Sequence, residues 1–144
     1  MASPDEWFNG NLKAFRDGTL ARFVVFDLGL SPQLHLKKLP RAGLFMPQSV
    51  VRKAVQKHGI DLDLLKNLPS AIQSPEKLFH SKSDPNSMIF VTPIRISGEA
   101  LVAVAEYGRH PDFGMIYLVK SIHPRPSHHF VLWEQEGLMC FKKE

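Results

Sequence analysis

The stretch that decides the fold is Ala100-Leu-Val-Ala-Val-Ala-Glu106, followed by Met115-Ile-Tyr-Leu-Val-Lys-Ser-Ile-His123, Phe130-Val-Leu-Trp133 and Leu138-Met-Cys-Phe141. These runs are short, apolar and separated by turn residues, which is typical of buried β-strands. Short connections usually join strands that are antiparallel neighbours. Residues 100–141 therefore predict the consecutive strands of a meander sheet.

The sequence before this stretch contains the helical signals. The expected helices are Pro47–Ile60, a first helix from Ser3-Pro4 to Asp17-Gly18, and a short helix over 61–68 that Pro69 stops. The helix Pro47–Ile60 has apolar residues at helical spacing, and Gly59 is its expected C-terminal glycine. Ser3 is a suitable N-cap, since Pro4 then takes the first helical position.

Further strands are expected over Ala21–Leu28 and Met88–Ile96, with a short extended piece or a helical turn at Leu34–Lys37. Pro93 indicates an edge position or a bulge in the second of these strands. The order of elements predicts an α+β domain, with N-terminal helices packed on one face of a four- to five-stranded antiparallel meander sheet. No linker divides the chain, so we expect a single domain over residues 1–144, with residues 1–20 as a helical extension of a core over residues 21–144.

Composition limits the class of protein. A chain of 144 residues with 44% hydrophobic and 22% charged residues is typical of a soluble globular protein. Its net charge of +4 is compatible with an anionic partner such as nucleic acid. The lone Cys140 cannot form an internal disulfide and is expected to be a buried, inert thiol. With no apolar run near the roughly 20 residues of a membrane span and no signal peptide, we expect a cytoplasmic protein without a membrane partner.

Polar side chains gather at the end of the second strand of this meander. With a strand period of two, Ser121 and His123 share a face with Tyr117, and Lys120 and Arg125 lie close by. A histidine beside an arginine can cleave a phosphodiester without a metal, because imidazole transfers the proton and guanidinium stabilises the phosphate charge. The alternative is a solvated surface loop in which these residues have no catalytic role.

Two other features contain histidine. His58 falls on the apolar face of the helix Pro47–Ile60, where a buried, hydrogen-bonded histidine is the default interpretation. His128 and His129 are adjacent on an expected strand and would point to opposite faces, which does not suit one metal ion. The sequence has no phosphate-binding glycine loop, zinc-ligand spacing or nucleophile elbow. We therefore expect no metal or cofactor.

Short motifs in a fixed order carry a family resemblance. They are Leu28-Gly29-Leu30-Ser31-Pro32, Lys57-His58, Leu68-Pro69, Ser74-Pro75, Val102-Ala-Val, Lys120-Ser121-Ile122, Trp133 and Gly137-Leu138. Over residues 24–142 the chain resembles the phage- and mobile-element-associated nuclease domains of the barnase, EndoU, colicin E5/D and RelE (BECR) fold group, of the type found with phage head-morphogenesis (MuF-type) proteins. The resemblance implies a pair of helices followed by a four-stranded antiparallel sheet. It also implies metal-independent RNA cleavage in a toxin or phage-conflict setting.

Carried over by position, the polar members of the family pattern are Lys57, His58 and Ser121. That pattern has an asparagine and a tyrosine where this chain has Tyr117 and His123, so the chain either uses His123 instead or has lost activity. The expected enzyme cleaves RNA through its own 2′-hydroxyl, with His58, Ser121 and His123 as catalytic residues. The expected substrate-binding residues are Lys57, Lys120, Arg125 and Tyr117.

The alternative from another functional class is a catalytically inactive module that binds RNA or a protein through the same open sheet face. The polar cluster would then only attract a negatively charged partner and would have no catalytic role. For the enzyme, the expected partners are RNA and a cognate immunity protein or antitoxin. The nuclease hypothesis requires Lys57-His58 and the Ser121–His123 strand to meet in space.

Overall fold

The computed structural model describes residues 3–32 and 40–143. The expected extended piece Leu34–Lys37 lies outside the described residues. The elements in chain order are α1 (Pro4–Arg16), β1 (Phe26–Leu30), β2 (Gly43–Met46), α2 (Gln48–His58), a 3-10 helix η1 (Leu62–Leu65), α3 (Leu68–Gln73), β3 (Lys77–His80), β4 (Ser87–Ile96), β5 (Glu99–His110), β6 (Gly114–Arg125), α4 (Ser127–Gln135) and β7 (Met139–Lys142).

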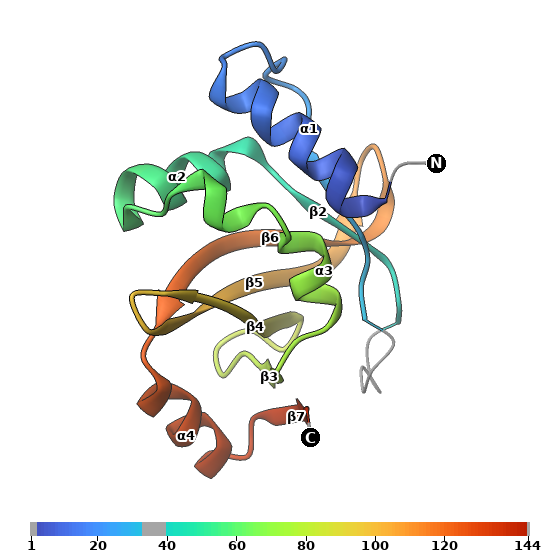
Figure 1. Cartoon of the computed structure of the whole chain (residues 1–144). Helices are drawn as coiled ribbons and strands as arrows, with labels where there is room; N and C mark the ends of the chain where they lie inside the picture. The colour runs from blue at the N-terminus through green and yellow to red at the C-terminus, as the bar shows by residue number, and fades with distance from the viewer. Residues whose placement is uncertain (1–2, 33–39, 144) are drawn as a thin grey trace.

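The strands form one seven-stranded mixed sheet in the order β1-β2-β6-β5-β4-β3-β7 (Figure 1). All neighbours are antiparallel except β2 and β6, which run parallel. The α+β class holds, but the expected four- to five-stranded antiparallel meander is wrong. The consecutive strands β3, β4, β5 and β6 are antiparallel neighbours, but the sheet extends beyond them, with β2 parallel to β6 on one side and β7 beside β3 at the far edge.

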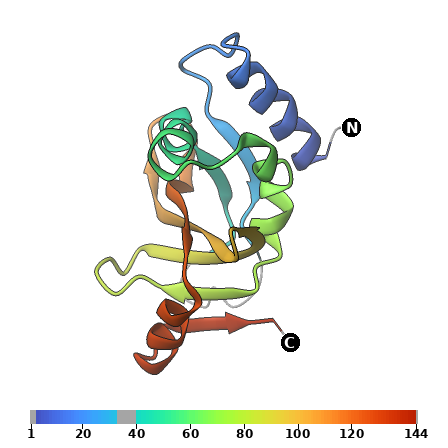
Figure 2. The same cartoon turned by 60° about the vertical axis from the view of Figure 1, so that its left-hand side comes forward.

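The two faces of the sheet are covered by different helices. Alternate residues of β5 divide between two apolar clusters: Leu101 and Ala103 join the large core that also contains side chains of α1, α2 and α3. Ala100 and Val102 join a smaller cluster closed by Phe130 of α4. Figure 2 shows α4 and β7 at the end of the molecule far from α1. The helices therefore do not all pack on one face, which is a second correction to the expected fold.

The expected strand Phe130–Trp133 is also wrong, since these residues lie within α4. Pro126 has an extended backbone and stands in the N-cap position, so the helix begins directly after it. In a helix Phe130 and Trp133 share one face, where both contact the ring of Phe79. A four-residue apolar run fits a strand or one helical turn equally well, and here packing selects the helix.

Elements with clear capping signals are confirmed. The Ser3 side chain accepts a hydrogen bond from the Glu6 amide at the start of α1. Gly59 is the C-cap of α2 and has a left-handed backbone conformation, with φ 63°. None of the described helices is long and apolar enough to cross a membrane.

Two boundaries in the N-terminal half differ from expectation. The strand expected over Ala21–Leu28 begins only at Phe26, and Phe23 is almost fully exposed. Pro69 lies inside the first turn of α3 instead of ending a helix, which is a position that proline tolerates well.

Candidate acid–base site

The candidate site lies on the C-terminal half of β6. Ser121, His123 and Arg125 stand opposite Val104, Val102 and Ala100 of β5 in the sheet register. They therefore share the sheet face that α4 partly covers. The register of β2 with β6 ends at Leu118, so the outer edge of β6 beyond it pairs with no described strand. Helix α2 packs beside this part of β6, and Ser121, His123 and Arg125 are partly exposed there.

A β-bulge at Lys120 decides which side chains share this face. Val104 pairs with Ser121 and Ala105 pairs with Val119, so Lys120 is the extra residue. The bulge reverses the alternation, and Val119 faces the large core while Ser121 faces the other side. The expectation that Tyr117 shares a face with Ser121 and His123 is therefore wrong.

Tyr117 is fully buried in the large core. Its hydroxyl donates a hydrogen bond of 2.8 Å to the carbonyl of Pro40. Burial, with a smaller contribution from Tyr107, raises the pKa of Tyr117 to about 12. The structure thus places this expected substrate-binding residue in the core, apart from the other candidates.

Ser121, His123 and Arg125 form a hydrogen-bonded chain. Nε of Arg125 donates to Nε2 of His123 at 3.1 Å, and Nδ1 of His123 lies 2.7 Å from Oγ of Ser121. Because a guanidinium only donates, Nε2 must be the unprotonated ring nitrogen. Nδ1 of His123 then carries the proton and donates to Ser121. The arrangement fixes both the orientation and the tautomer of His123.

Arg125 also connects the strand to α4. Its Nη1 lies 3.0 Å from Nδ1 of His129, and its guanidinium lies over the Trp133 ring, 5.2 Å from the centroid. The sequence interpretation missed His129, because it placed this residue on a strand. The available signal was Pro126, which can precede a helix, and a helix brings His129 back towards β6.

His58 reaches the same place from the C-terminal end of α2. The centroids of the His58 and His123 rings are 5.7 Å apart. His58 is exposed, so the interpretation of a buried, hydrogen-bonded histidine is wrong. The helix end and the strand therefore meet in space, as the nuclease hypothesis requires.

The surroundings of His123 favour its neutral form. Burial is the main cause, followed by the positive charge of Arg125 and then by His58, and together they lower the pKa of His123 to about 4. A neutral imidazole at pH 7 can accept a proton, and a bound anion would raise this pKa. The structure thus holds His123 as a neutral imidazole, a form that can accept a proton.

The two lysines of the expected site differ in their partners. Lys120 makes ion pairs with Glu106 at 2.8 Å and with Asp84 at 3.5 Å, and hydrogen bonding to Glu106 is the main cause of its raised pKa. Lys57 is exposed, and no described carboxylate lies within ion-pair distance of it. The lysine of α2 that lines a small hollow together with His58, Lys120 and Ser121 is Lys53. The unpaired charge near the site therefore comes from Lys53 and Arg125 more than from Lys120.

The donor set suits acid–base chemistry. Within residues 3–32 and 40–143, no three His, Cys, Asp or Glu side chains gather where they could hold a metal ion. Two imidazoles and a guanidinium, with a hydroxyl that orients one imidazole, can transfer protons and bind an anion. Cys140 stands apart from this group as a partly buried thiol whose pKa is raised by burial.

The family of the chain follows from a comparison with family models. The model described as the phage MuF C-terminal domain matches residues 49–144, two thirds of the chain. The chain belongs to this family. No curated protein and no solved structure matches it.

The match places the candidate site inside the MuF C-terminal domain. It begins at Ser49, in the first turn of α2, and continues through β7. It therefore includes His58 and the residues Ser121, His123 and Arg125. The protein is a phage-associated α+β domain, and α1, β1 and β2 precede the matched part.

Proposed function

We propose that this MuF C-terminal domain is a metal-independent ribonuclease that cleaves RNA by transphosphorylation. The observation that carries the proposal is the pairing of His58 and His123, whose ring centroids are 5.7 Å apart beside the guanidinium of Arg125. The matched family is described only as a phage domain. Nuclease activity of the BECR type is therefore part of the proposal.

The reaction uses the 2′-hydroxyl of RNA as the nucleophile. One imidazole takes the proton of this hydroxyl, and its oxygen attacks the adjacent phosphorus. The other imidazole gives a proton to the 5′-oxygen as the bond from phosphorus to that oxygen breaks. The products are a 2′,3′-cyclic phosphate and a 5′-hydroxyl end. Two histidines within reach of one phosphate can carry out both proton transfers, so no protein nucleophile is needed.

His123 is the better candidate for the base and His58 for the acid. His123 is neutral at pH 7 and is oriented by Ser121. A bound phosphodiester would attract the guanidinium of Arg125 away from Nε2 of His123, because a charge-assisted bond to phosphate is stronger than one to neutral imidazole. The freed lone pair would then accept the proton, and Arg125 would stabilise the charge that develops on the phosphate.

One observation favours a second candidate function. Arg125 bonds both His123 and His129, which ties α4 to β6 and engages the lone pair that a base needs. On this second account the domain is a catalytically inactive module that binds RNA or a protein at the same face. A cognate immunity protein or antitoxin is part of the enzyme proposal only, since an inactive module needs no inhibitor.

Mutation of the two histidines separates these accounts. Purified protein is incubated with RNA in the presence of EDTA, and His58→Ala and His123→Ala are compared with wild type. Each change is expected to reduce the cleavage rate roughly 100-fold or more, which is typical for loss of a general acid or base. His128→Ala is the matched control, because His128 is exposed and lies on α4 beside His129.

The control is expected to cleave at the wild-type rate. Intact RNA after incubation with folded wild type would reject the ribonuclease and leave the binding module. Equal activity in all four proteins would show that the cleavage comes from a contaminating enzyme.

A further inference from the structure

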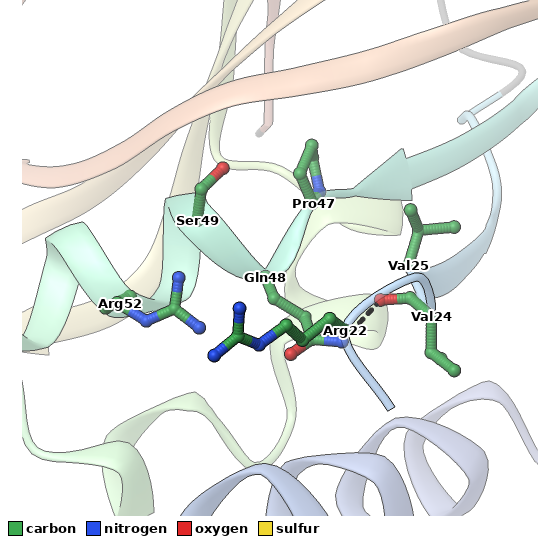
Figure 3. A pocket seen from close by; sticks show the side chains of 7 residues that line it. All are labelled: Arg22, Val24, Val25, Pro47, Gln48, Ser49 and Arg52. Carbon is green, nitrogen blue, oxygen red and sulfur yellow. Dashed lines mark hydrogen bonds between the residues drawn. The ribbon is translucent and has the colours of Figure 1, made fainter. Parts of the chain in front are cut away.

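A second basic feature lies at the opposite end of α2 from His58. A hollow of about 510 Å³ separates the start of α2 from the segment that leads into β1. Figure 3 shows that the guanidinium groups of Arg22 and Arg52 point toward each other across this hollow. Arg22 comes from the segment before β1 and Arg52 from the second turn of α2.

The two arginines have no described anionic partner. Neither guanidinium lies within ion-pair distance of a carboxylate among residues 3–32 and 40–143. Arg52 lies over the ring of Phe15, 5.7 Å from the centroid, which positions it without neutralising it. Two facing positive charges repel each other unless an anion lies between them. The hollow therefore suits a phosphate-sized anion.

Gln48 holds the two sides of the hollow together. Its side chain is 8% exposed, and its Nε2 donates at 2.7 Å to the carbonyls of both Ala21 and Val24. These bonds fasten the segment that carries Arg22 to the first turn of α2. These partly buried hydrogen bonds thus fix the two backbone segments from which the exposed side chains of Arg22 and Arg52 extend.

The start of α2 adds to the positive potential. Pro47 provides no side-chain cap, and the first turn contains no acidic residue. The free amides at a helix start and the helix dipole both favour an anion. This contribution is secondary to the two arginines.

We propose that Arg22 and Arg52 bind a backbone phosphate of a single-stranded RNA that lies along α2. Arg52 and His58 are six residues apart on α2, which corresponds to about 9 Å along the helix axis. Lys53 and Lys57 are exposed between the two ends. The choice of RNA rests on the proposed function, whereas the phosphate site rests on the paired arginines.

Phe23 supports a nucleic acid as the ligand. It follows Arg22 in the chain and is 88% exposed. Exposed aromatic rings beside cations are the usual stacking platforms for unpaired bases. A Phe23→Ala change is expected to weaken RNA binding roughly tenfold. Unchanged affinity would overturn the assignment of Phe23 to base stacking.

Binding is measured with a fluorescein-labelled 2′-O-methyl RNA, which lacks the nucleophile and cannot be cleaved by the proposed reaction. The Arg22→Ala/Arg52→Ala variant is expected to raise Kd roughly tenfold or more and to reduce the dependence of Kd on salt. The matched control is Arg109→Ala/Lys143→Ala, which removes the same charge from exposed residues elsewhere. This control is expected to change Kd less than threefold.

Equal weakening in both double variants would overturn the site, because net charge alone would explain it. Displacement of the RNA by polyglutamate at equal charge concentration would overturn RNA as the ligand. The proposed function is tested independently of this result. Binding through the arginine pair without cleavage of ordinary RNA would reject the ribonuclease and support the phosphate site. Cleavage of ordinary RNA by wild type, with an unchanged Kd in the double arginine variant, would support the ribonuclease and reject the phosphate site.

Discussion

At the scale of single residues, Arg125 organises the candidate site. One planar guanidinium bonds His123 and His129 and covers the ring of Trp133. A lysine cannot replace it, since a single ammonium on a flexible chain does not provide this fork of donors. The guanidinium therefore adds to the burial that favours neutral His123, and it connects His123 to α4.

This environment predicts a pH-dependent stability. His123 has a pKa of about 4 in the folded protein, below the ordinary value of 6.5, because of burial and then of Arg125 and His58. Between these two pH values the unfolded chain binds more protons at this residue than the folded protein does. The free energy of unfolding is thus expected to decrease as pH falls from about 6.5 to about 4.

Urea unfolding at several pH values checks this prediction with His123→Gln, which keeps a polar side chain of similar size. The variant should show a smaller loss of stability over this pH window than wild type, and His128→Gln should behave like wild type. Parallel pH curves for wild type and His123→Gln would contradict the environment described for His123.

At the scale of elements, local chemistry predicted some structures well. The helix caps Ser3 and Gly59 are local signals, and both helices form as expected. The strand Gly43–Met46 was missed because it is only four residues long and lies between turn residues. The bulge at Lys120 has no sequence signature, and yet it decides which side chains of β6 face the site.

The helical state of α4 makes a testable prediction. In a strand Phe130 and Leu132 would share a face, whereas in α4 Phe130 is 5% exposed and Leu132 is 52% exposed. Phe130→Ala is expected to reduce the free energy of unfolding by about 3 kcal/mol, because it leaves a cavity under α4. Leu132→Ala should change it by less than about 0.5 kcal/mol. Denaturant unfolding measures both, and similar losses in the two variants would contradict the helix.

At the scale of the whole molecule, the topology creates the site. Because β2 runs parallel to β6 and ends beside Leu118, α2 continues along the open edge of β6 and brings His58 to His123. The sequence suggested which polar residues to consider, including Ser121 and Arg125. It could not predict their distances, because these depend on the pairing of strands that are far apart in the chain.

The activity that we propose for this domain is cleavage of RNA through the 2′-hydroxyl. The most direct test is mass spectrometry of a short RNA incubated with the wild-type domain in EDTA, beside the same RNA with a 2′-O-methyl group at every position. The expected fragments end in 2′,3′-cyclic phosphate and begin with 5′-hydroxyl, and the methylated RNA is expected to stay intact. Intact RNA, or fragments with 3′-hydroxyl and 5′-phosphate ends, would contradict it.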